Sequence, residues 1–233
     1  MTVLALTAIA GCDSTQQQAA RARLKAARFI ASSGRTVVRR RNPDVRVLAV
    51  TLLRGSRGSA IAVRLRNRSL RPRNDLPISV GIVARGGRET YLNAAANTYY
   101  FETHLASIGA RRSATWVFTT SDALPAGATP VAAVGARPSV PATTVRSLPR
   151  LEVAAVGSPT RSKLHIKVTN ASAVPQYQVQ IYALGLARGR YVAAGRATIG
   201  HLGTQSSAIV TLTLIGGPRP TSIELEALPT MFQ

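Results

Sequence analysis

An internal repeat constrains the fold of this chain more than any other feature of its sequence. The stretch RLRNRSLRPRNDLPISVGIVARG in the first half aligns without a gap to KVTNASAVPQYQVQIYALGLARG in the second half. The alignment places Asn67 opposite Asn170, a shift of 103 positions, and both stretches end in Ala-Arg-Gly. Several identities in one register predict two copies of the same domain.

A second match shows where the two copies differ in length. IGARRSA at 108–114 aligns to LGTQSSA at 202–208, which is a shift of 94 positions. The first copy therefore holds nine more residues between the two matches, and we place this insertion within Asn93–Phe101 (NAAANTYYF). Its aromatic residues, Tyr99, Tyr100 and Phe101, could form an exposed loop that contacts a partner, or they could cover the first domain.

Each copy alternates apolar and polar residues as β-strands do. In AIAVRLRNR at 60–68, Ile61, Val63 and Leu65 share one face while arginines occupy the other. The same alternation occurs in LHIKVT at 164–169, QYQVQIYA at 176–183 and SAIVTLTLI at 207–215. Short strands separated by Gly, Pro and Asn predict an all-β fold of two tandem β-sandwiches.

The strand pattern of the second copy resembles a known family of modules. It runs LHIKVTNAS, VQIYA, GRYVAAG and HLGTQSSAIVTL. This pattern resembles the bacterial immunoglobulin-like or fibronectin type III-like extracellular modules, and among them the FxLYD-like group. The resemblance covers residues 150–230 well and 45–138 more loosely, because Arg112 stands opposite Ser206 and Leu76-Pro77 interrupts a strand. It implies immunoglobulin-like sandwiches and an extracytoplasmic location, but no ligand or chemistry.

The N-terminus holds the only cysteine of the chain, Cys12, after the apolar run VLALTAIA and Gly11. The sequence IAGC resembles the lipobox of bacterial lipoproteins. That resemblance implies cleavage after Gly11, a diacylglyceryl group on the Cys12 sulfur and a membrane anchor. The basic residue that usually precedes the apolar run is missing, and a chance AGC after an apolar strand is the alternative. One cysteine allows no intrachain disulfide.

These features predict five segments along the chain. They are a lipoprotein signal peptide (1–11), a lipidated basic tether with a short helix over 16–31 (12–44), a first β-sandwich (45–138), a proline-rich linker (139–150) and a second β-sandwich (151–233).

The chain is strongly basic, with 30 Lys and Arg against 9 Asp and Glu and a net charge of +21. Such a charge suits anionic partners, including nucleic acid, anionic lipid or acidic cell-wall polymer. The preference for Arg over Lys could also reflect a GC-rich genome. The densest stretch, RLRNRSLRPR, holds Arg64, Arg66, Arg68, Arg71 and Arg73. We predict these five as an anion- or partner-binding site, with the first three on one strand face; a solvated outer face is the alternative.

The sequence offers little for catalysis. The three histidines are His104, His165 and His201, and the first and last fall in different copies. Glu224 and Glu226 share one strand face, which we expect to be solvated. No nucleophile elbow or phosphate-binding loop occurs, so we expect no enzyme activity, cofactor or metal site.

The expected function is therefore that of an interaction or structural module of the cell envelope, anchored to the outer face of a bacterial membrane through Cys12. Anionic lipid, cell-wall polymer or a protein would be its partner. A purely structural spacer is one alternative. A basic nucleic-acid-binding protein is another, which the lipobox disfavours. The sequence leaves the oligomeric state open.

Overall fold

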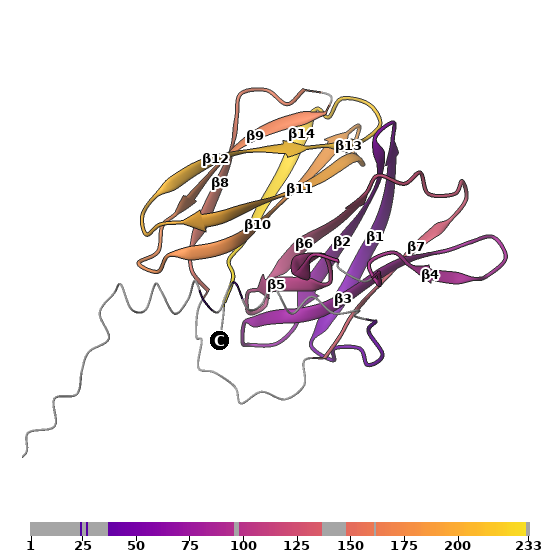
Figure 1. Ribbon diagram of the computed structural model, residues 1–233, viewed down its shortest axis with the longest axis horizontal. Helices are drawn as coiled ribbons and strands as arrows, with labels where there is room; N and C mark the ends of the chain where they lie inside the picture. Colours follow the sequence, from indigo (N-terminus) through magenta and orange to yellow (C-terminus); the bar gives the residue numbers. More distant parts are fainter. Residues whose placement is uncertain are drawn as a thin grey trace, which may run out of the picture.

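The computed structural model describes residues 37–95, 98–136, 148–160 and 162–231, together with Leu24 and Ala27. The described chain is built of β-strands in four sheets (Figure 1). The first half contains β1 (Val45–Gly55), β2 (Gly58–Asn67), β3 (Arg73–Val83), β4 (Glu89–Tyr91), the short 3-10 helix η1 (Tyr100–Glu102), β5 (His104–Ile108), β6 (Ser113–Thr120) and β7 (Thr129–Val134). The second half contains β8 (Leu151–Val156), β9 (Lys163–Asn170), β10 (Gln176–Ala187), β11 (Arg190–Leu202), β12 (Ser207–Thr213), β13 (Ile215–Gly216) and β14 (Ser222–Leu228).

The predicted all-β sandwich fold is confirmed. In the first half, the sheet β1-β2-β6 packs on the sheet in which β3 pairs with β4, β5 and β7. In the second half, β12-β9-β8 packs on β13-β11-β10-β14. The alternation read from the sequence builds both cores, since Ile61, Val63 and Leu65 of β2 are fully buried, as are Ile166 and Val168 of β9.

The two halves repeat one another strand by strand. β10 pairs on one side with the unbroken strand β11, and on the other with β14. β3 pairs correspondingly with β7, but its other partner is split into β4 and β5. The predicted insertion Asn93–Phe101 lies in this break, between β4 and β5. Pro77 does not interrupt β3, which continues through it to Val83.

A buried asparagine closes the same turn in each half. Asn67 is fully buried, donates from Nδ2 to the carbonyls of Arg71 (2.8 Å) and Gly109 (3.0 Å), and accepts from the N–H and hydroxyl of Ser69. Asn170 makes the equivalent bonds to Val174 (2.9 Å), Gly203 (2.9 Å) and Ser172. The backbone of Arg112 accepts from Asn67 just as that of Ser206 accepts from Asn170. The side chain at this position is therefore free to differ between the copies.

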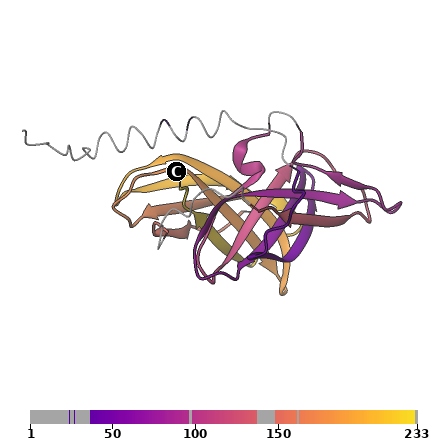
Figure 2. The ribbon, with the colours of Figure 1, turned by 90° about the horizontal axis from the view of Figure 1, so that it is seen from below.

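The two sandwiches lie side by side (Figures 1 and 2). They also share a core. Tyr182, Leu184 and Ala194 of the second half belong to the buried cluster of the first. On β2, Ala60 and Ala62 are buried on the face that bears Arg64, and Arg64 contacts Glu224 of β14 at 2.7 Å. The Arg64 part of this β2 face and the Glu224–Glu226 face pack on each other. The expectation that the two glutamates are solvated therefore fails for Glu226, which is only partly exposed, and holds for Glu224, which is exposed. Small side chains on β2 allow this approach.

Glycine permits a close backbone contact between the halves. A Cβ on Gly55, at the end of β1, would lie 2.7 Å from the carbonyl oxygen of Gly216 in β13. Any larger residue at position 55 would push the two backbones apart.

The insertion docks on the second half. Tyr100 and Phe101 are buried in the first core, which agrees with a cover over that domain. Tyr99 reaches the neighbouring sheet, where its hydroxyl donates to Gln178 Oε1 at 2.6 Å. Glu102 pairs with Arg196 of β11 at 3.1 Å. The insertion therefore covers its own sandwich and fastens it to the other.

The last part of the predicted tether belongs to the first sandwich. Asn42 donates to the carbonyl of Val134 at 2.8 Å, and Ala136 donates to the carbonyl of Arg40 at 3.0 Å. Residues 38–42 thus run along the edge of β7, because that edge strand offers free backbone groups. The signal peptide (1–11), the helix over 16–31 except Leu24 and Ala27, and residues 139–147 of the linker lie outside the described residues.

We predict that Asn67→Ala and Asn170→Ala each lower the free energy of unfolding by about 3 kcal/mol, because each leaves buried carbonyl and N–H groups without partners. Urea denaturation followed by circular dichroism measures this. Ser158→Ala, an exposed change outside both turns, is the control and should stay within about 0.5 kcal/mol of wild type. Equal midpoints for all variants would contradict the structural role of the asparagines.

Glu226 gives the interface a predicted pH dependence. Burial raises the pKa of Glu226, while a hydrogen bond from the Thr115 N–H (2.6 Å) acts in the opposite direction. The folded state then holds the proton more tightly than the unfolded chain. Ionisation of Glu226 therefore costs stability as the pH rises above the ordinary value of 4.5 through the raised pKa. Glu226→Gln removes this cost and keeps an oxygen for Thr115.

Relative to wild type, the Glu226→Gln protein should gain stability as the pH is raised from 4 to 7. Thermal unfolding across this pH range measures the difference. Glu152→Gln, at an exposed carboxylate on β8, controls for the loss of one negative charge. A constant difference between Glu226→Gln and wild type at every pH would refute the assignment.

Candidate anion-binding surface

The structure divides the five arginines predicted from RLRNRSLRPR into two groups. Arg64 pairs with Glu224, and Arg73 pairs with Asp44. Both are therefore neutralised and contribute to contacts within the chain. Arg66, Arg68 and Arg71 are exposed at one end of the first sandwich. The predicted ladder along one strand face is thus interrupted at Arg64. The predicted lipidation site, Cys12, lies outside the described residues.

Three arginines from other parts of the chain join the exposed group. Arg46 on β1 stands directly opposite Arg66 on β2, which places their Cβ atoms about 5 Å apart. Arg111 donates its N–H to the carbonyl of Ser69, and the Arg112 carbonyl accepts from Asn67. We call these residues the arginine cluster: Arg46, Arg66, Arg68, Arg71, Arg111 and Arg112.

The arginine cluster carries uncompensated charge. All six of its residues are exposed, and none has a carboxylate within ion-pair distance among the residues that the structure describes. The hydroxyl of Ser113 is the one side-chain partner seen for the cluster within the described chain, 3.4 Å from Arg66 Nη1. Guanidinium groups stay protonated at any physiological pH. An anion at this end of the sandwich would therefore reduce repulsion between neighbouring cations.

The second copy provides an internal comparison for this cluster. The equivalent positions are Glu152, Thr169, Ala171, Val174, Gln205 and Ser206, so no basic residue occurs among them. The buried asparagine and the turns around it are nevertheless the same in both halves. Even the contact between Arg66 and Ser113 has a neutral counterpart, in which the hydroxyls of Thr169 and Ser207 lie 2.8 Å apart. The fold therefore does not require the arginines.

Part of this cluster was visible in the sequence. Arg111 and Arg112 stand opposite Gln205 and Ser206 in the second alignment, and comparing charge between the copies would have singled them out. Arg46 could not be found in this way, because it joins the cluster only through the pairing of β1 with β2.

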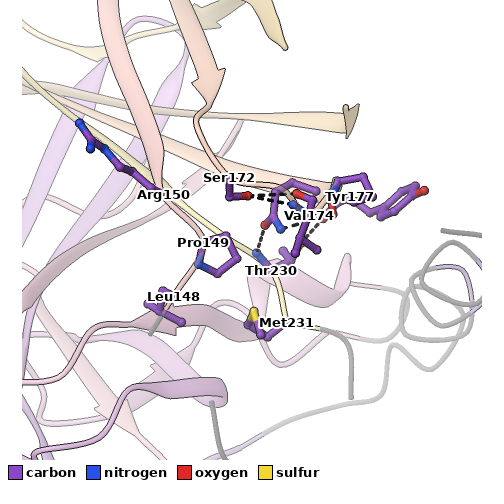
Figure 3. A pocket seen from close by; sticks show the side chains of 10 residues that line it. Leu148, Pro149, Arg150, Ser172, Val174, Tyr177, Thr230 and Met231 are labelled. Carbon is purple, nitrogen blue, oxygen red and sulfur yellow. Dashed lines mark hydrogen bonds between the residues drawn. The ribbon is translucent and has the colours of Figure 1, made fainter. Parts of the chain in front are cut away.

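Two hollows share Leu148, Pro149 and Arg150, and Arg112 of the arginine cluster lines one of them. The first has a volume of about 520 Å³ and lies between the β5–β6 turn, which contains Arg112, and the end of β14. The second, of about 390 Å³, is shown in Figure 3 and is lined mainly by apolar side chains, including Val174, Tyr177 and Met231. Arg150 pairs with Glu152 at 2.7 Å, so its charge is compensated.

Histidine and carboxylate side chains do not gather in one place in the part of the chain that the structure describes. No group of three or more His, Cys, Asp and Glu side chains suitable for a metal ion occurs in the described part of the chain. His104 stacks on Tyr100, and His201 on Tyr177, in different halves. Burial raises the pKa of Tyr182, whose hydroxyl has no hydrogen-bond partner within the described residues.

The described part of the chain contains no helix that is long and apolar enough to cross a bilayer.

Comparison with known proteins leaves the function open. No family model matches the chain, and no curated protein matches it. Red sea bream transglutaminase is similar with a TM-score of 0.24 and 13% identity, over 81% of this chain and 29% of that one. A β-glucuronidase from glycoside hydrolase family 2 is similar with a TM-score of 0.21 and 13% identity, over 78% and 23%. The chain spans less than a third of either structure, and at these TM-scores the similarity supports no functional argument.

Proposed function

We propose that this chain is an extracytoplasmic lipoprotein with immunoglobulin-like domains of the FxLYD-like group, anchored to a bacterial membrane through Cys12, and that it binds an anionic polymer of the cell envelope. The observation that carries the binding proposal is the arginine cluster. Six exposed arginines without carboxylate partners among the described residues occupy one end of the first sandwich, where the second copy has none.

The arrangement of the arginine cluster suits a chain of phosphate groups. Each guanidinium offers five donors in a planar fork, which matches two phosphate oxygens at once. The arginines come from β1, β2 and the two turns that Asn67 joins, so their backbones are fixed before an anion arrives. A polymer that contacts several of them releases counterions with each contact, which makes its affinity dependent on salt.

We predict that the triple variant Arg66→Ser/Arg68→Ser/Arg71→Ser binds long-chain polyphosphate at least about tenfold more weakly than wild type at low salt, since it loses up to three phosphate contacts. Titration calorimetry at several salt concentrations gives both the affinity and its salt slope. The slope should become shallower in the variant.

The matched control removes the same charge from the second half. Arg188, Arg190 and Arg219 are exposed on loops and the strand β11, and their triple replacement by serine lowers the net charge equally. If both triple variants lose affinity to the same degree, binding depends on net charge alone and the site assignment is wrong.

A second prediction tests the membrane anchor. In a bacterium with a lipoprotein pathway, the wild-type chain should lose residues 1–11, gain the mass of acyl groups and enter the detergent phase, whereas Cys12→Ser should do none of these. Two acyl chains anchor a protein firmly because each buried CH₂ contributes about 0.8 kcal/mol. Intact mass spectrometry with detergent partitioning measures both properties. A wild-type chain that stays soluble with residue 1 in place would overturn the proposed location.

A structural spacer is the second candidate, favoured by the core that the two halves share. A spacer needs rigidity but no ligand. If the protein is only a spacer, neither wild type nor either triple variant should bind polyphosphate. The calorimetry described above therefore separates the two functions.

A further inference from the structure

We propose that the arginine cluster and the side chain of Leu70 together form a docking surface for an anionic lipid bilayer. This inference rests on the proposed function, because it uses the same anion-binding surface, and it extends that function by giving the surface an anionic bilayer as a partner in addition to the polymer. It assigns the first sandwich a second contact with the membrane, in addition to the lipid on Cys12.

Leu70 is the most exposed large hydrophobic residue described in the structure, with 78% of its surface accessible. It lies at the tip of the turn between β2 and β3, flanked by Arg68 and Arg71. The Ser69 hydroxyl oxygen lies within hydrogen-bond distance of both Asn67 Oδ1 (2.9 Å) and the carbonyl oxygen of Arg71 (2.8 Å), so its one proton is shared between these two acceptors. Hydrogen bonds therefore hold the turn on both sides of Leu70, whereas the Leu70 side chain packs little against the rest of the protein.

The second copy again shows that the fold does not require this feature. Ala173 occupies the position equivalent to Leu70, between Ser172 and Val174, and the turn is closed by the same asparagine bonds. The turn of the second copy has an exposed apolar residue of its own, Val174, which is 56% exposed, but no arginine beside it. An exposed apolar side chain and exposed arginines thus occur together only in the turn of the first copy.

A further exposed leucine lies near the cluster. The register of β1 and β2 shifts between Val47 and Ala49, which leaves Leu48 without a partner across the strands. Its side chain is 57% exposed and lies two residues from Arg46. Exposed apolar residues are ordinary when single, but they indicate an interaction surface when they accompany a patch of one charge.

The combination favours a bilayer over a soluble polymer. A polyanion in water offers phosphate groups to the arginines but nothing apolar to a leucine. A bilayer with acidic phospholipids offers both, because the headgroups attract arginines while the acyl boundary just beneath them accepts apolar side chains. The residues between Cys12 and Val37 allow such docking, since 25 peptide steps reach at most about 90 Å.

The test uses the full chain with Cys12→Ser in every sample, so that no acyl chain is attached. Flotation with vesicles of phosphatidylglycerol in phosphatidylcholine measures bilayer binding, and vesicles of pure phosphatidylcholine give the background from the N-terminal apolar run. Leu70→Ser should bind the acidic vesicles about tenfold more weakly, as expected for a leucine that leaves an apolar medium. Its affinity for polyphosphate should be unchanged.

Ile209→Ser is the matched control, since Ile209 is 65% exposed on β12 of the second sandwich and far in sequence from every member of the cluster. It should bind acidic vesicles as well as the Cys12→Ser parent. The double variant Leu48→Ser/Leu70→Ser should bind more weakly than Leu70→Ser. Circular dichroism confirms that each variant is folded.

The outcomes separate this inference from the function on which it rests. If Leu70→Ser binds acidic vesicles as well as its parent while the triple arginine variant loses both vesicles and polyphosphate, the bilayer proposal is refuted and polymer binding stands. If the triple arginine variant binds both probes like its parent, the arginine cluster is not an anion site and both proposals fail.

Discussion

The surface described above depends on one buried amide. Asn67 sits at the end of β2, fully enclosed, and its four hydrogen-bonding positions join the turn after β2 to the turn before β6. Without this bond set, the two turns would be joined only by backbone hydrogen bonds such as that from the Arg111 N–H to the Ser69 carbonyl, and their arginines would be held together less firmly. Because Asn67 is buried, these hydrogen bonds are hard to lose. A buried carbonyl or N–H group without a partner destabilises the folded state far more than an exposed one does.

The equivalent asparagine in the second copy helps to distinguish residues that stabilise the fold from residues that could bind a partner. Asn170 closes an equivalent turn with equivalent partners, yet the six positions that correspond to the arginine cluster carry neutral or acidic side chains. The repeat thus shows which residues the sandwich needs for its own stability. Asparagine and serine remain in both copies, whereas the arginines and Leu70 occur in one. This contrast within a single chain is stronger evidence than the net charge of +21, which a composition bias alone could produce.

The shared core gives the arginine cluster a rigid base. β2 is buried on both faces, with Val63 in its own sandwich and Ala62 against the second. Tyr99 of the insertion and Glu102, which directly follows it, fasten the halves at another point. Two sandwiches packed in this way behave as one body with respect to anything bound at the end of β2. Neighbouring arginines on β2 differ in their contacts. Arg64 forms an ion pair with Glu224 of the second half, whereas Arg66, two residues further along the strand, is exposed to solvent.

Sequence alone was sufficient for the repeat, for the strands at 60–68, 164–169, 176–183 and 207–215 and for the place of the insertion, although it wrongly interrupted β3 at Leu76-Pro77. These follow from local alternation and from identities such as Asn67 and Asn170, which depend on neighbours along the chain. Which face of β2 is buried could not be read in this way, because its Arg64 face looks solvent-exposed until the second sandwich is placed against it. The sequence also could not predict that Arg46 lies near Arg111 and Arg112, because Arg46 is more than sixty residues away from them along the chain. The sequence determined only the positions of the charged residues along the chain. Ion pairs and clusters of charge form between strands that are distant in sequence, so the tertiary structure decided which charges pair and which cluster.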